Sequence, residues 1–286
     1  MEVLVHFVAP ALVGVLIGIA SGLLGIGGGT VMVPIFRLAF GMSATMSTAT
    51  SLFAIIPTSI SGAISHVKGK TCIPALGIAA GLGGACLSPV GVWLAQLSPD
   101  WLVMLAAALI IGYSAINMFK KAFKLRPAGQ PATGVDAAAA ASLTSSGDAA
   151  AAAPTADDSS LSRKQLLQGA AIGLVAGLAS GYVGVGGGFI MVPLMLSIIG
   201  IPMRKASGTS LIAVMILAIP GVIEQGIIGN INYLAGIAIV IGTIPGAVIG
   251  ARLVTKVPER TLRLLFGCFL IVAAVMLVLN EVGIFG

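Results

Sequence analysis

Two glycine clusters are the parts of this chain best suited to binding a ligand. The motif GIGGG at residues 25–29 recurs as GVGGG at residues 184–188, and the copies align without a gap at an offset of 159 residues. Glycine tolerates positive φ, so successive glycines can take the backbone out of a helix. A helix that begins directly after them presents unpaired N–H groups and the positive end of its dipole. We therefore expect a small anion to bind the backbone at Gly25, Gly27, Gly28, Gly29, Gly184, Gly186, Gly187 and Gly188.

Close helix packing is the alternative explanation for glycines in apolar segments. We favour packing for Gly14, Gly18 and Gly22, which are spaced four residues apart. A dinucleotide-binding fingerprint does not fit, because neither cluster completes G-x-G-x-x-G and no acidic residue follows at the required distance.

Hydroxyl side chains are the next candidates for the same site. Thr50 and Ser51 recur at the same offset as Thr209 and Ser210. We expect these four to help bind the substrate, although serine and threonine in membrane helices also bond back to their own helix. A further equivalent pair directly precedes the glycines: Ser21 and Ser180.

Three ionisable residues lie within or beside the apolar segments. Glu224 is the only acid inside such a segment, and an acid there is a candidate for carrying a coupling proton. His66 lies near the equivalent segment end in the first half and changes charge near neutral pH. The alternative for both is an interfacial position without a role in transport. Arg37 could attract the anion or extend to the lipid headgroups.

No enzyme chemistry is visible in the sequence. It contains no paired carboxylates, no nucleophile with a neighbouring base, and no metal-ligand cluster. Cys72, Cys86 and Cys268 lack metal or redox spacing and are expected to be packed thiols. We therefore expect neither a catalytic residue nor a cofactor nor a metal site.

The composition is that of an all-α polytopic membrane protein. The 286 residues are 58% hydrophobic and 8% charged, whereas soluble domains carry about 25% charged residues. The mean hydropathy is +1.11. The net charge of +6 does not indicate nucleic-acid binding, because the basic residues lie between apolar segments, where membrane topology explains them.

Each half of the chain contains five hydrophobic segments. The first half has 3–24, 30–40, 44–66, 72–97 and 101–119, and the second has 165–183, 189–199, 206–228, 231–254 and 261–280. The second segment of each half is short. A helix over 30–40 would span about 16 Å, against a hydrocarbon core of about 30 Å, so it is either a half-helix or part of a crossing completed by the glycine loop.

Residues 127–162 differ from the rest of the chain. They are mostly Ala, Ser, Thr, Gly, Pro and Asp, a composition that cannot form a core and predicts a disordered linker. The linker separates two transmembrane repeats, 1–126 and 163–286.

The basic residues favour opposite insertion of the two repeats. With an odd number of crossings per half and a cytoplasmic linker, every lysine and arginine except Arg37 is cytoplasmic, and both termini are periplasmic. Parallel halves would move six basic residues outside: Arg204, Lys205, Arg252, Lys256, Arg260 and Arg263. Inverted-topology repeats are typical of alternating-access carriers, in which interrupted helices form the binding site.

These motifs resemble the TauE/SafE sulfite and organosulfonate exporter family, also called toluenesulfonate uptake permeases. The resemblance is carried by the doubled stretch Gly22–Pro34 and Gly181–Pro193, and by Ser47–Leu52 and Ala206–Leu211. It covers everything except the linker, which departs from the usual pattern. It implies transport of sulfur-containing anions, such as sulfite or organosulfonates, across the bacterial inner membrane, without fixing the substrate.

We therefore expect a secondary carrier whose two halves rock about a central anion. A passive anion channel and a membrane-embedded enzyme or redox partner are the alternatives. The expected partners are the anion and the lipid bilayer, with protons as candidate coupling ions; the sequence permits an oligomer and does not indicate nucleic acid.

Overall fold

The computed structural model describes residues 9–124 and 162–281, and every regular element in these ranges is helical. The first half contains α1 (Ala9–Leu24), α2 (Gly29–Phe40), α3 (Ala44–Lys68), α4 (Pro74–Leu97) and α5 (Asp100–Lys124). The second half contains α7 (Arg163–Val183), α8 (Gly188–Leu194), the π-helix η2 (Met195–Ile199), α9 (Met203–Ile228), α10 (Tyr233–Leu253) and α11 (Glu259–Glu281). The predicted all-helical fold is confirmed. The expected linker lies outside the described residues, apart from Ser162, which caps α7.

The helices of the two halves correspond one to one. Residues 159 positions apart begin each equivalent pair: α2 and α8, α3 and α9, α4 and α10, and α5 and α11. The capping interactions are repeated as well. Asp100 at the start of α5 accepts a hydrogen bond from the Ala44 amide at 3.2 Å, and Glu259 at the start of α11 accepts one from the Met203 amide at 3.1 Å. Each acid thus ties the last helix of its half to the start of the third.

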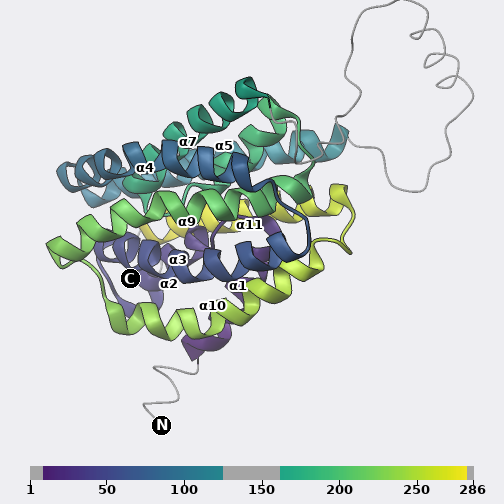
Figure 1. The fold of residues 1–286 in the computed structure, drawn as a ribbon. Helices are drawn as coiled ribbons and strands as arrows, with labels where there is room; N and C mark the ends of the chain where they lie inside the picture. The colour runs from purple at the N-terminus through teal and green to yellow at the C-terminus, as the bar shows by residue number, and fades with distance from the viewer. Residues whose placement is uncertain (1–8, 125–161, 282–286) are drawn as a thin grey trace, which may run out of the picture.

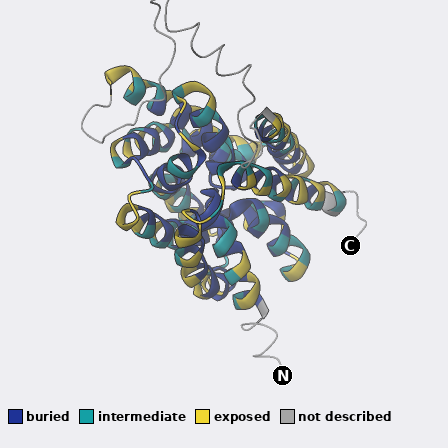
Figure 2. Cartoon of the chain, turned by 90° about the vertical axis from the view of Figure 1, so that its right-hand side faces the viewer, coloured by how far each residue is buried: buried dark blue, intermediate teal, exposed yellow. Residues whose placement is uncertain are grey.

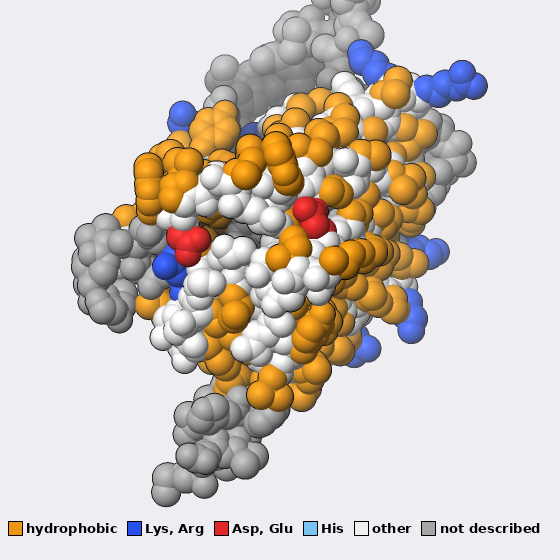
Figure 3. Space-filling view, turned by 90° about the vertical axis from the view of Figure 1, so that its left-hand side faces the viewer, with side chains coloured by type: hydrophobic (Ala, Val, Ile, Leu, Met, Phe, Trp, Pro, Cys, Tyr) orange, Lys and Arg blue, Asp and Glu red, His pale blue; other side chains and the backbone are white. Residues whose placement is uncertain are grey.

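Seven of the described helices are long and apolar enough to cross a membrane. Buried residues line the middle of the bundle, and exposed ones face outward (Figure 2). Figure 3 views one end of the bundle along the helix axes. Hydrophobic side chains form the rim of this end, and its centre consists mostly of backbone and side chains that are neither hydrophobic nor charged. Because large aliphatic side chains such as Leu109 and Ile227 remain exposed, these outer faces suit lipid rather than water.

The second segment of each half is confirmed to be short. α2 has 12 residues, or about 18 Å of helix. Its counterpart is not a uniform α-helix, because α8 changes to the π-helix η2 at Met195. Gly41 and Gly200, both left-handed, end the two segments. No sequence signal predicts the π-helical turn.

Glycines allow two helix pairs to approach closely, α1 with α10 and α4 with α7. A methyl group added at Gly18 would lie 2.4 Å from the Thr243 carbonyl oxygen, and one at Gly22 would lie 2.1 Å from that of Ala247. In the equivalent contact between α4 and α7, a methyl group added at Gly173 would lie 1.9 Å from the Ala80 carbonyl oxygen. The packing interpretation of the first helix is therefore confirmed.

The third helices of the two halves, α3 and α9, form the centre of the molecule and run antiparallel. Gly62 near the end of α3 packs on Leu211 near the start of α9, whereas Gly221 near the end of α9 packs on Leu52 in the first half of α3. Figure 1 shows these two helices between α4 and α7 on one side and α1 and α10 on the other. This arrangement brings the loops before α2 and α8 into the interior.

Candidate anion-binding site

Both glycine clusters leave the helical conformation, as expected. The φ angles of Gly25, Gly27 and Gly28 are 75°, 80° and 86°, and those of the equivalent Gly184, Gly186 and Gly187 are 73°, 87° and 68°. Gly29 and Gly188 then begin α2 and α8. Within the described ranges, the amides of Gly27, Gly28, Gly186 and Gly187 make no hydrogen bond. The residues immediately before each short helix therefore present free donors.

The two clusters meet each other at the centre of the bundle. A methyl group added at Gly29 would lie 2.6 Å from the Val185 carbonyl oxygen, and one at Gly188 would lie 2.5 Å from that of Gly25. The N-terminal ends of α2 and α8 thus converge. Each end contributes roughly half a positive charge to the same buried region.

Ile55 and its equivalent Val214 stand between the clusters. A Cβ at Gly27 would lie 2.9 Å from Val214 Cγ1 and 3.3 Å from Ile55 Cγ2, and a Cβ at Gly186 would contact the same two side chains. All of these residues are buried. The region is therefore closed by apolar side chains in this structure.

The predicted hydroxyls form hydrogen bonds that cross from one half to the other. Ser51 donates to the Gly184 carbonyl oxygen, and Ser210 donates to that of Gly25 at 2.7 Å. Ser210 also lies 2.9 Å from the carbonyl oxygen of Ser207, so the bond back to its own helix is present too. These two serines hold the carbonyl side of each cluster. Their direct contact with a substrate stays a prediction.

Thr50 and Thr209 connect the halves at the starts of the fourth helices. Thr50 Oγ1 accepts from the Asn232 amide at 3.0 Å, and Thr209 Oγ1 accepts from the Ile73 amide at 2.9 Å. Thr209 also donates to the Lys205 carbonyl at 2.7 Å. Both threonines therefore support the helix ends, and their predicted contact with the anion is not tested by this arrangement.

Four other hydroxyls, near the clusters in sequence or in space, lack a hydrogen-bond partner in the part of the chain that the structure describes, as do those of Ser47 and Ser88. The four belong to fully buried side chains: Ser21, Thr30, Ser59 and Ser180. A Cβ at Gly27 would lie 3.4 Å from Ser59 Oγ, and one at Gly28 would lie 3.6 Å from Ser21 Cβ. Leaving a buried hydroxyl unpaired costs about 1–3 kcal/mol, so such groups call for a partner.

Ser59 was not predicted from the sequence, although a signal existed. It follows Ser51 by eight residues and Ile55 by four, a spacing that keeps residues near one face of a helix. Thr30 lacked such a signal, because phenylalanine occupies its equivalent position, 189. Ser21 and Ser180 could be found from the sequence by their position directly before the glycines.

His66, in the last turn of α3, is fully buried in the bundle. Its Nε2 lies 2.8 Å from the Gly22 carbonyl oxygen, to which it donates, and its Nδ1 lies 2.7 Å from Thr71 Oγ1. The equivalent Gln225 makes the matching bond by accepting from Asn230 Nδ2 at 2.8 Å. Since glutamine replaces it in the same arrangement, His66 has an evident structural role. A role in coupling stays a prediction.

Glu224 lies near the end of α9 and is partly exposed. Its Oε2 atom is buried without a hydrogen-bond partner among the described residues. In the described ranges, Glu224 makes no hydrogen bond to the glycine clusters. Proton binding at Glu224 would therefore have to influence anion binding without direct contact.

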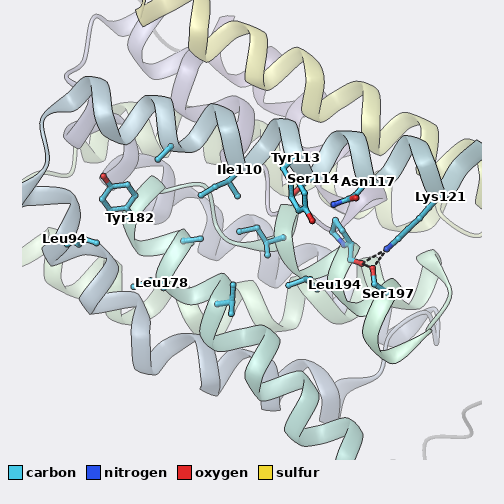
Figure 4. A pocket seen from close by; sticks show the side chains of 15 residues that line it. Leu94, Ile110, Tyr113, Ser114, Asn117, Lys121, Leu178, Tyr182, Leu194 and Ser197 are labelled. Carbon is cyan, nitrogen blue, oxygen red and sulfur yellow. Dashed lines mark hydrogen bonds between the residues drawn. The ribbon is translucent and has the colours of Figure 1, made fainter.

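A large cavity lies elsewhere, between α5, α7 and the α8–η2 segment (Figure 4). Its volume is about 730 Å³ and its walls are mainly apolar. At one end Lys121 Nζ donates to Ser197 and to the Pro193 carbonyl oxygen, and Tyr182 lies at the other end. The glycine clusters do not line this cavity.

The described residues contain no group of three His, Cys, Asp or Glu side chains that could hold a metal. Cys72 is buried, as expected for a packed thiol, but Cys86 and Cys268 are exposed on the outside of the bundle. Apolar sequence context could not distinguish the interior from a face that meets lipid.

Comparisons with known proteins agree with this architecture. A family model described as "Sulfite exporter TauE/SafE" matches residues 10–277. The chain is 27% identical to the probable membrane transporter protein YunE of Bacillus subtilis, over 98% of this chain and 99% of that protein. A probable membrane transporter protein of Haemophilus influenzae is 28% identical over 94% and 97%.

A plant relative matches a smaller region. The "Sulfite exporter TauE/SafE family protein 3" of Arabidopsis thaliana is 30% identical over 37% of this chain and 23% of that protein. No solved structure matches the chain. Because the family model spans nearly the whole sequence, this protein belongs to the TauE/SafE sulfite exporter family of membrane transporters.

Proposed function

We propose that this protein is a secondary carrier that moves a small sulfur-containing anion, such as sulfite or an organosulfonate, across the bacterial inner membrane. One observation carries the proposal: two short helices begin at the same buried point, each preceded by amides without acceptors. The side chains of Ser21 and Ser59, whose hydroxyls have no partner among the described residues, lie beside the first cluster. Such a site would bind a tetrahedral or pyramidal oxyanion through several weak donors without a buried arginine.

The proposed carrier consists of two repeats inserted in opposite directions. The antiparallel packing of the equivalent helices α3 and α9 supports this, and so does the exchange of charge between equivalent positions. Lys68 corresponds to Ile227, whereas Arg204 corresponds to Thr45. The positive-inside rule then assigns the linker to the cytoplasm and both termini to the periplasm.

Cysteine-accessibility mapping tests this topology. In a background without the native cysteines, K68C and R204C should react with an impermeant reagent from the cytoplasmic side, and I227C from the periplasmic side. Labelling of K68C and I227C from one side would contradict opposite insertion.

Transport would proceed by rocking of one half against the other about the glycine clusters. The bonds from Ser51 to Gly184 and from Ser210 to Gly25 join the halves at the site itself. A change in the relative position of the halves would therefore change the shape of the clusters. Export of an anion would be assisted by a membrane potential negative inside. Import would need a coupled cation, for which Glu224 is a candidate proton carrier.

The decisive experiment is a flux screen in proteoliposomes. Sulfite, sulfate, thiosulfate and sulfonates would be compared with and without a pH gradient. Saturable flux of a sulfur anion at carrier-like turnover is expected. Flux of none of them would refute the proposed substrate class, and steady currents far above carrier turnover would indicate a channel.

A further inference from the structure

A second cavity lies between the C-terminal parts of α3 and α10. It has a volume of about 520 Å³, and its wall includes the hydroxyls of Ser61, Ser65 and Thr255. The side chains of Lys68 and Arg252 belong to the same wall. In contrast to the apolar cavity beside α5, this one combines hydroxyl donors with two cations.

The cations of this cavity are not neutralised by neighbouring acids. Lys68 and Arg252 are both exposed, and neither forms an ion pair within the described ranges. No acidic residue lines the cavity. Its electrostatic potential is therefore favourable to an anion, and a concave site lined by one sign of charge raises the local concentration of a ligand of the opposite sign.

The cavity and the candidate anion site are both formed in part by α3. Ser61, in the wall of the cavity, is two residues along α3 from Ser59, whose hydroxyl faces Gly27. Lys68 is nine residues from Ser59, or about 14 Å along the helix. Ser61 donates to the Thr58 carbonyl oxygen at 3.0 Å, and Thr58 Oγ1 lies 2.6 Å from Thr243 Oγ1. Thr58 and Thr243 thus form a buried hydroxyl pair between α3 and α10, the two helices beside the cavity.

The equivalent face of the other half has the opposite character. Because α3 and α9 are antiparallel, it lies at the other end of the bundle. There Ile227 replaces Lys68, Trp93 replaces Arg252, and Glu224 replaces Ser65. Figure 3 faces this end, where α9 leads into α10, and shows acidic side chains on it, with lysine and arginine mainly at the margins. The two cations that line the cavity are therefore not repeated at the equivalent positions of the other half.

We propose that the cavity between α3 and α10 is the vestibule that collects the substrate anion on the Lys68 side of the membrane, and that the opposite end, bearing Glu224, collects the anion less well because it lacks this pair of cations. The inference rests on the proposed transport of a sulfur oxyanion. It adds an intrinsic asymmetry: the anion is captured well from the Lys68 side and released easily on the Glu224 side. By the charge rule the Lys68 side is the cytoplasm, so the asymmetry favours export.

If Lys68 and Arg252 only stabilised the helix ends, removing their charges would affect transport differently from the loss of a vestibule. Lysine and arginine in the last turn of a helix stabilise its C-terminus, and Lys68 and Arg252 both occupy such positions. Loss of that stabilisation would affect transport measured from either side. Loss of a vestibule would affect only the apparent affinity from one side.

The test uses the full-length protein in right-side-out and inside-out membrane vesicles, with radiolabelled sulfite as the probe. K68Q and R252Q should each raise the KM roughly fivefold, the effect of one unit charge a few ångströms away in water. The increase should occur only when sulfite is presented on the Lys68 side, should shrink at high salt, and should leave the maximal rate unchanged. K120Q removes a cation that does not line the cavity and should leave both KM values unchanged.

A reciprocal variant tests the asymmetry directly. I227K introduces a cation at the position equivalent to Lys68 and should lower the KM measured from the Glu224 side. An unchanged KM in both K68Q and R252Q, or equal changes from both sides, would overturn the vestibule while leaving the proposed function intact. Failure of the wild-type protein to carry sulfite or any sulfonate would refute the proposed function itself.

Discussion

The substitution G28A should strongly reduce transport while the protein remains folded. Gly28 has a φ of 86°, and a methyl group there would lie 3.0 Å from Met32 Cε, 3.1 Å from Ile17 Cγ2 and 3.6 Å from Ser21 Cβ. The two close contacts are with side-chain methyl groups rather than backbone, and each needs a shift of only a few tenths of an ångström. The methyl group would occupy space beside Gly28 and Ser21, where we expect the anion.

The magnitude has two separate parts. A left-handed alanine costs about 1–2 kcal/mol, which lowers the unfolding temperature by roughly 2–8 °C at this chain length. Losing one hydrogen bond to a charged ligand costs about 1.5–3 kcal/mol, which is roughly a 10- to 150-fold loss in kcat/KM. The transport defect should therefore greatly exceed what the loss of stability explains.

G41A is the matched control. Gly41 is also left-handed, with a φ of 61°, but a methyl group there meets nothing within 4 Å. It carries the backbone strain without reaching the site, so it should lower the unfolding temperature and transport normally. Sulfite flux and thermal unfolding would be measured on both purified variants. Equal transport by G28A and G41A would refute binding at the cluster.

Three further predictions concern the halves, their packing and the coupling group. S51A and S210A each leave a buried glycine carbonyl without its cross-half donor and should lower unfolding stability by about 1–3 kcal/mol; unchanged melting in detergent would contradict these bonds. G242A places a methyl group 1.8 Å from a backbone oxygen of α1, whereas one at Gly112 meets nothing within 4 Å; G242A should thus be destabilised by about 1–3 kcal/mol, and G112A should not, in the same melting assay. E224Q should abolish a pH dependence of flux if this acid carries the coupling proton, and an unchanged pH profile would end its candidacy.

The helices and their duplication were predictable because both depend on local sequence. Long apolar runs predict membrane helices, and the repeated glycine motif indicates a break at equivalent points. The departure from helix at Gly27 and Gly186 was indicated by the runs of glycine, since no other residue tolerates these φ values as readily. These features needed no knowledge of which helices are neighbours.

The interior of the site was harder to predict because it depends on contacts between distant residues. The bond from Ser210 to Gly25 joins residues 185 positions apart. The sequence shows that Ser51 and Ser210 occupy equivalent positions in the two repeats. It does not show that each of them donates to a glycine cluster of the other half. The unpaired Ser59 hydroxyl is distinguished from ordinary helix serines only by what surrounds it.

Location of a bound anion would test the central claim most directly. Selenite is an oxyanion analogue of sulfite, and its anomalous scattering identifies its position in a crystal of the purified protein. The account predicts a peak beside the amides of Gly27 and Gly28, of Gly186 and Gly187, or between the two clusters. A selenite ion bound only in the apolar cavity near Lys121, with none at the clusters, would contradict it.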